Sequence, residues 1–126
     1  MLTPADLDPV DVRRAVTALL DRDPGEVPWE TADVEHHLAH STTAWLTRLR
    51  GQASDGTAWS LIVKATVRGV ATGDNLWTSS PDPTHRNYWK REYLAFDSGL
   101  LGSLPGRLRA PRCLLTTSPS DEQGYI

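Results

Sequence analysis

The sequence predicts an α+β fold: an antiparallel sheet of roughly five strands with one long packing helix, preceded by a short N-terminal helix. Three observations predict it. Apolar residues recur with helical spacing near the N-terminus, the next stretch alternates apolar and polar residues as strands do, and a second helical stretch follows a polar loop. With 126 residues, of which 39% are hydrophobic and 23% charged, the chain has the composition of one folded domain.

The first predicted element is a helix over residues 9 to 21, "PVDVRRAVTALLD". Its apolar positions, among them Val12, Val16 and Leu19, fall on one face at helical spacing. The proline suits the first turn of a helix, and "DRDPGEVPW" ends the helix. We therefore assign residues 1 to 28 to a packing helix and its linker.

Three strands are expected between residues 32 and 66. Their sequences are "ADVEHHLAH", "AWLTRLRG" and "TAWSLIVKATV", and a turn signal, "QASDG", separates the last two. The first part has an alternative, because apolar residues from Val34 to Leu49 would also form the stripe of a helix. Thr42 and Thr43 are poor helix residues in the middle of that stripe, which favours strands.

The second half of the chain is expected to hold the long helix and further strands. Residues 69 to 82 have no period and read as a loop, and "THRNYWKREYLAFDS" (84 to 98) follows as a helix that a glycine ends. "RCLLTT" (112 to 117) is typical of a strand, and "SPSDEQG" (118 to 124) of a hairpin turn. The final "YI" would open one more strand.

One of the two lysines of the chain, Lys64, lies in its most strand-like stretch. On a strand, Trp59, Leu61 and Val63 point to one face, which is apolar and belongs to the core. Lys64 lies on the opposite, mixed face together with Ile62. A lysine at a sheet surface commonly keeps its ammonium group in water and covers apolar area with its stem. Lys64 alone therefore indicates no site.

A glutamate on the second predicted helix changes this interpretation. At about 100° per residue, Glu92 falls between Tyr88 and Phe96, on the apolar face expected to pack on the sheet. A carboxylate there is costly unless a cation meets it. The nearest candidates by sequence are Arg91 and Lys64, and we expect the strand lysine and the helix glutamate to pair.

The stretches "LIVK", "YWKREYLAF" and "LRAPRCL", in this order, resemble the N-terminal lobe of protein-kinase-like small-molecule phosphotransferases, especially the aminoglycoside-phosphotransferase and choline-kinase-like group. The resemblance covers roughly residues 30 to 126. It implies a nucleotide-binding lobe over residues 29 to 126, with ATP and Mg²⁺ as cofactors of the full-length family. Lys64 would hold the α- and β-phosphates, Glu92 would orient Lys64, and Ile62 would line the adenine pocket.

Kinase-like folds cover the phosphates with a loop between their first two strands, often a glycine-rich one. The corresponding loop here is "AHSTTA", which has no glycine. The resemblance implies that Ser41, Thr42 and Thr43 offer hydroxyl and backbone N–H groups to a phosphate instead. A plain polar hairpin turn explains the same residues at least as well.

The sequence offers no catalytic residue for phosphoryl transfer. The family places an aspartate after a histidine or glycine, then an asparagine and a metal-binding aspartate, and none of these follows Glu92 in that order. We therefore expect an N-lobe that is incomplete at its C-terminal end and inactive alone. It would meet a missing C-terminal lobe or self-associate through the exposed lobe interface. The acceptor implied by the family is a small hydroxylated molecule.

The cluster "HHLAH" supports a different class of function, a non-catalytic metal-binding or interaction module. On a helix, His36 and His40 would lie one turn apart and could share Zn²⁺. On a strand they would stand roughly 13 Å apart, too far for one ion. No Glu, Asp or Cys is placed to complete the site. A helix over residues 34 to 49 would favour this module, and strands there would favour the kinase-like lobe.

Charge and cysteine content limit the partners and the compartment. A net charge of −3 without a long basic stripe argues against nucleic acid and anionic membranes as partners. We also expect no membrane span and no signal peptide, because the sequence has neither a long apolar run nor the N-terminal pattern. The only cysteine, Cys113, cannot form an internal disulfide, which favours the reducing cytoplasm.

Overall fold

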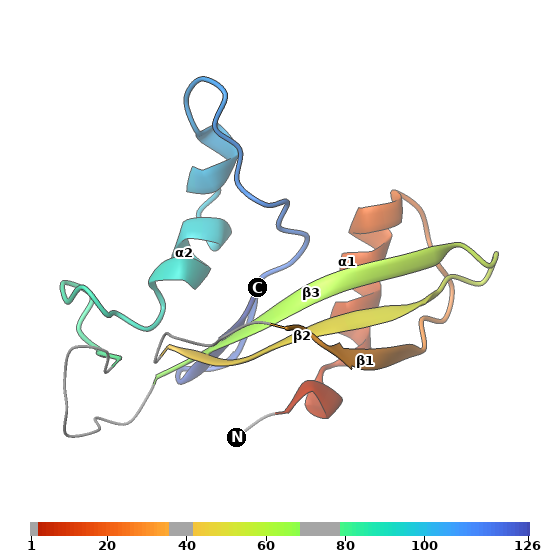
Figure 1. The fold of residues 1–126 in the computed structure, drawn as a ribbon, viewed down its shortest axis with the longest axis horizontal. Coiled ribbons are helices and arrows are strands. Elements are labelled where there is room, and N and C mark those ends of the chain that lie inside the picture. The colour runs from red at the N-terminus through yellow and green to blue at the C-terminus, as the bar shows by residue number, and fades with distance from the viewer. Residues whose placement is uncertain (1–2, 36–41, 69–78) are drawn as a thin grey trace.

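The computed structural model describes residues 3 to 35, 42 to 68 and 79 to 126. These residues form an α+β fold around one antiparallel sheet of five strands, in the order β1-β2-β3-β5-β4 (Figure 1). The elements in chain order are η1 Pro4–Asp6, α1 Pro9–Leu20, β1 Trp29–Asp33, β2 Thr43–Gln52, β3 Ala58–Val67, α2 Arg91–Asp97, η2 Leu100–Ser103, β4 Thr117–Ser120 and β5 Gln123–Tyr125. The expected fold class and the five-stranded antiparallel sheet are thereby confirmed.

The two faces of the sheet have different neighbours. Helix α1 lies behind β1, β2 and β3 in Figure 1, whereas α2 lies toward the end of the sheet at which β3 stops. The hydrophobic core forms between α1 and the sheet face that carries Trp59, Leu61 and Ala65 of β3. From α1 it includes Val16, which is fully buried. In the described ranges, neither helix is both long and apolar enough to cross a bilayer.

Helix α1 forms where the sequence predicts it, for local reasons that can be named. Asp8 caps its N-terminus by accepting a hydrogen bond from the Val10 amide at 2.8 Å, and Pro9 occupies the first turn. The helix ends at Leu20, and the C-cap residue Asp21 takes the left-handed conformation with φ 57°. Its buried face presents Val12, Ala15 and Val16 to the sheet.

The hairpin between β2 and β3 is fixed by its turn. The Asp55 carboxylate accepts hydrogen bonds from the Thr57 amide at 3.0 Å and from the Arg22 guanidinium at 2.8 Å. These bonds, first of all those from the Thr57 hydroxyl and amide, lower the pKa of Asp55 from 3.8 to about 2. Gly56 supplies the positive φ, 84°, that the turn requires.

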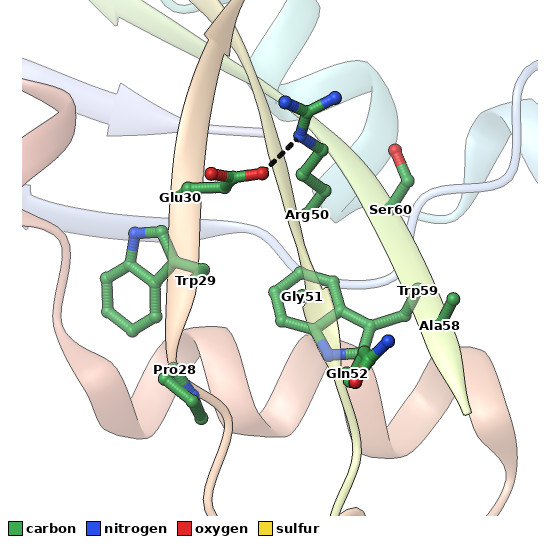
Figure 2. A pocket seen from close by; sticks show the side chains of 9 residues that line it. All are labelled: Pro28, Trp29, Glu30, Arg50, Gly51, Gln52, Ala58, Trp59 and Ser60. Atoms are coloured by element: carbon green, nitrogen blue, oxygen red, sulfur yellow. Dashed lines mark hydrogen bonds and ion pairs between the residues drawn. The ribbon is translucent and has the colours of Figure 1, made fainter. Parts of the chain in front are cut away.

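A close packing contact joins the first three strands. In register, Trp29 lies opposite Gly51, and Gly51 lies opposite Trp59. Figure 2 shows the Trp59 ring lying over the Gly51 backbone, with the Glu30–Arg50 ion pair of 2.6 Å beside it. A Cβ atom on Gly51 would lie 2.4 Å from the Pro28 carbonyl oxygen and 2.8 Å from the Trp59 ring. Any side chain at position 51 would therefore clash with these atoms, which explains the glycine.

The first strand differs from the expectation. The prediction placed it over "ADVEHHLAH", whereas β1 is Trp29–Asp33. The reason is the partner: β1 pairs with the second half of β2, from Thr47 to Gly51. The histidines of "HHLAH" lie outside the described residues.

The long helix expected over residues 84 to 98 is present only as α2, which begins at Arg91. In a helix, the Asn87 carbonyl would accept a hydrogen bond from Arg91. Instead it accepts one from the Ser80 amide at 2.8 Å, while Trp89 donates to the Ser80 carbonyl at 3.1 Å. The backbone before Arg91 is therefore hydrogen-bonded to Ser80 and forms turns instead of a helix.

The last strands are also shifted. The strand expected over residues 112 to 117 begins only at Thr117, which pairs with Tyr125. The residues expected to form a seven-residue hairpin turn, 118 to 124, instead extend β4 to Ser120 and open β5 at Gln123. The expected strand at "YI" exists in part, because Tyr125 ends β5.

The Gly51 contact predicts a stability difference between two glycine variants. We expect Gly51→Ala to lower the free energy of unfolding by roughly 1–3 kcal/mol, because the added methyl group meets backbone and a buried ring. Gly102→Ala is the control, since a Cβ there would meet nothing within 4 Å. Urea unfolding of both variants measures the difference, and equal stability would contradict this account of β2.

The Asp55 turn predicts a pH dependence. Because the pKa of Asp55 is lowered from 3.8 to about 2 in the fold, its contribution to stability is present above pH 3.8 and is lost as the pH falls toward 2. Asp55→Asn should therefore be less stable than the parent chain at neutral pH. Thermal unfolding of both proteins across this window should show the difference shrinking; a difference independent of pH would refute the assignment.

Candidate functional site

Lys64 is held on the mixed face of the sheet by backbone pairing on both sides of β3. Its partner on β2 is Leu46. On the other side, its backbone N–H and C=O form two hydrogen bonds with Ile126, each 3.0 Å long. The backbone of Lys64 is therefore fixed, while its side chain keeps 28% of its surface exposed.

Helix α2 is anchored over the same face by Tyr93, its buried residue. A Cβ atom on Gly124 of β5 would lie 2.8 Å from the Tyr93 ring, so the missing side chain lets the ring approach the sheet. At the end of the helix, the Thr116 hydroxyl donates to Asp97 at 2.7 Å. Two contacts with the β4–β5 region thus set the position of the residue beside Tyr93, which is Glu92.

The expected lysine–glutamate pair is confirmed. The Lys64 Nζ atom lies 2.5 Å from Oε2 of Glu92, although the two residues are 28 positions apart in sequence. The alternative partner for the glutamate, Arg91, instead donates to the backbone carbonyls of His85 and Arg86 at 2.6 and 2.9 Å. Among the described residues, the ion pair joins the mixed face of β3 to α2.

The reason given for that pair needs correction. Glu92 was expected inside a buried face between Tyr88 and Phe96, but its side chain is 45% exposed. The aromatic residues that α2 and the preceding turn bury are Tyr93 and Trp89. Because the helix begins at Arg91, Tyr88 does not belong to it, and the expected apolar face between Tyr88 and Phe96 does not form.

A cavity of about 470 Å³ adjoins the ion pair. It extends from the mixed face, where Ile62 and Lys64 line it, around the edge of β3 to the apolar side of α1. Phe96 of α2 and the segment from Pro111 to Leu115 form further walls. Its lining is mostly apolar and includes two cations, Lys64 and Arg112, and two carboxylates, Asp11 and Glu92.

The structure brings together three of the six residues that the sequence suggested. Lys64, Glu92 and Ile62 line the cavity, and Ile62 is 47% exposed on the same face as Lys64. Thr42 and Thr43 do not line it: Thr42 is buried, and its carbonyl accepts a hydrogen bond from the Val67 amide at 2.9 Å. Ser41 lies outside the described residues.

Several lining residues were not expected from the sequence. Leu46 faces Lys64 across the β2–β3 ladder, and the alternation of β2 could have placed it there. Asp11 and the apolar residues of α1 line the other end, and no sequence pattern indicates their approach to β3. Cys113 is also a wall residue. Partial desolvation raises the pKa of its thiol above the ordinary value, although the residue is exposed.

The arrangement suits an anion better than a metal ion. A lysine ammonium group has three hydrogen-bond donors, and one of them is directed at Glu92. Within the described ranges, no group of three His, Cys, Asp or Glu side chains could hold a metal ion. The helix over residues 34 to 49 that would favour a histidine metal module is absent from residues 43 to 52, which form β2.

The chain was compared with protein families, curated proteins and solved structures. No protein-family model matches the chain, and neither the curated proteins nor the solved structures give a match.

The exposure of the ion pair predicts that it contributes little to stability. Lys64→Met and Glu92→Gln should each lower the free energy of unfolding by only about 0–1 kcal/mol, because water screens a partly exposed pair. Tyr93→Ala is the contrasting variant, and we expect a loss of roughly 3 kcal/mol from the emptied contact with β5. Urea unfolding compares the three, and a Glu92→Gln loss as large as that of Tyr93→Ala would contradict the prediction.

Proposed function

We propose that the chain is the nucleotide-binding lobe of an ATP-dependent phosphotransferase family protein that acts on a small hydroxylated molecule. The observation that carries the proposal is the contact of 2.5 Å between Lys64 on the third strand and Glu92 on the next α-helix. In protein kinases, the lysine of the third strand pairs with a glutamate of the following helix, and the pair must be in place for phosphoryl transfer.

The cavity beside the pair supports the same assignment. Lys64 would meet the α- and β-phosphates with the ammonium donors that Glu92 does not use. Glu92 would hold the ammonium group in place without neutralising the whole site, because both side chains remain partly exposed. Ile62, an exposed apolar residue two positions earlier on the same face, would contact the adenine ring.

The proposal assigns nucleotide binding, and not catalysis, to this chain. Phosphoryl transfer also requires Mg²⁺ and an oriented nucleophile, which a lysine–glutamate pair does not supply. These groups would come from a C-terminal lobe, and contact with such a lobe or with a second copy would cover the exposed face.

A lysine-reactive nucleotide tests the proposal directly, because the chain has only two lysines. An acyl-phosphate derivative of ATP transfers its acyl group to a lysine that lies against the phosphates. We expect Lys64 to be acylated several-fold faster than Lys90, and free ATP with Mg²⁺ to suppress only the Lys64 reaction. Peptide mass spectrometry reads both sites in one sample.

Lys90 is a matched control, because its ammonium group lies 5.6 and 5.2 Å from the ring centroids of Trp89 and Tyr93, outside the cavity lining. Lys90→Met should leave the acylation of Lys64 unchanged, and Glu92→Gln should slow it. Equal acylation of the two lysines, with no competition by ATP, would overturn the proposed function.

A further inference from the structure

A second cavity, of about 380 Å³, lies beside the end of helix α2. Its walls all come from residues 96 to 113, which include η2 and the segment that forms the loop at the top of Figure 1. It is distinct from the cavity beside Lys64, although Phe96 and residues 111 to 113 belong to the walls of both. Neither Lys64 nor Glu92 lines it.

Two backbone turns bring leucines to the walls of this cavity. Gly99 takes φ 75° directly after α2, and Gly106 takes φ 64° in the turn that follows η2. A Cβ atom on either glycine would meet nothing within 4 Å, so the left-handed backbone, and not crowding, requires them. Leu101, Leu104 and Leu108 line the cavity, and the first two are partly buried. One part of the cavity is therefore apolar.

The charged residues that line this cavity have one sign. They are Arg109 and Arg112, and no Asp or Glu among the described residues lines it. Residues 98 to 120 contain three arginines and no Asp or Glu, in a chain whose net charge is −3. Asp97, the nearest carboxylate in sequence, is not a wall residue and accepts the Thr116 hydroxyl at 2.7 Å. The cavity beside Lys64 differs, because its cations and carboxylates are equal in number.

Both guanidinium groups are held in place by neutral backbone groups. Nη1 of Arg109 donates to the carbonyls of Gly106 and Leu108 at 3.3 and 2.8 Å, and Nη2 of Arg112 donates to the Ala18 carbonyl at 2.8 Å. Within the described part of the chain, Nε and Nη2 of Arg109 have no partner. These two nitrogens form the edge of a guanidinium that can bind both oxygens of one carboxylate.

We propose that this cavity binds a small carboxylate with an apolar tail, such as a medium-chain fatty acid. The carboxylate pairs with Arg109 and Arg112, and the tail packs on Leu101, Leu104 and Leu108. A neutral ligand would leave the two cations without a counter-charge, and a cationic ligand would be repelled. The volume lies near the lower end of the range of about 300–1,000 Å³ that is typical of small-molecule sites, which suits a ligand of this size.

This inference goes beyond the proposed nucleotide site and does not depend on it. Arg109 and Leu104 line only the cavity beside the end of α2, whereas Lys64 and Glu92 line only the other. Lys64→Met should therefore leave binding of the carboxylate unchanged, and Arg109→Gln should leave the acylation of Lys64 by the nucleotide probe unchanged.

Octanoate is the probe that tests the site. An NMR titration of the amides of the whole chain measures its dissociation constant, and we expect the shifts to centre on residues 99 to 113. Hexanoate should bind about tenfold more weakly, because two fewer CH₂ groups are buried. 1-Octanol has the same tail and no charge, and it should bind at least about tenfold more weakly, because it cannot form charge-assisted hydrogen bonds with the arginines.

The segment supplies its own matched control variants. Arg109→Gln should weaken octanoate binding by about tenfold, whereas Arg107→Gln should not, because Arg107 is exposed and does not line the cavity. Leu104→Ser should weaken binding by at least about threefold, whereas Leu100→Ser, outside the lining, should not. Urea unfolding shows that each variant is folded, and the exposed Arg109 decides the test if Leu104→Ser is not.

The inference is wrong if octanoate causes no shifts in residues 99 to 113, if 1-octanol binds as tightly as octanoate, or if Arg109→Gln and Arg107→Gln weaken binding equally. The second result would show an apolar cavity without an anion site. None of these results bears on the acylation of Lys64, so failure of this inference and failure of the proposed function are distinguishable.

Discussion

The structure depends on the two-residue alternation of strand β3. One face of β3 packs in the core with α1 and carries Trp59, Leu61 and Ala65. The residues between them therefore point to the opposite face. A shift of β3 by one residue would bury the Lys64 ammonium group among apolar side chains. The free energy of desolvating that charge would destabilise the fold. The same apolar packing that stabilises the sheet therefore places the cation on the open face, beside Ile62.

The position of Glu92 depends on packing rather than on charge. A partly exposed ion pair gains too little free energy to hold a helix in place. Helix α2 is instead fixed by the Tyr93 ring against Gly124 and by the hydrogen bond of Thr116 to Asp97. The pair can then exchange partners with little loss of stability. This property suits the proposed role of Lys64 as a phosphate ligand.

The sequence alone was sufficient to predict the elements that depend on local residue patterns. Alternation and turn residues predict β2 and β3, helical spacing predicts α1, and the faces of β3 follow from the alternation. The ion pair was also predictable, although its stated reason was wrong. The Glu92 side chain is 45% exposed, and the apolar face expected between Tyr88 and Phe96 does not form, because α2 begins only at Arg91. That start depends on the Asn87 carbonyl accepting a hydrogen bond from Ser80, a tertiary contact that no propensity scale contains.

Strands whose existence depends on a partner were less predictable. Residues 112 to 116 have the composition of a strand but remain irregular, because β5 pairs with β4 only from Thr117 onward. A strand forms only where a neighbouring backbone offers hydrogen-bond partners, and the composition of a segment does not report whether that neighbour is present. Lys64 is the opposite case. Its two backbone hydrogen bonds with Ile126 extend the β3–β5 ladder by one position beyond Ala65, and they fix the backbone from which the ammonium group reaches Glu92.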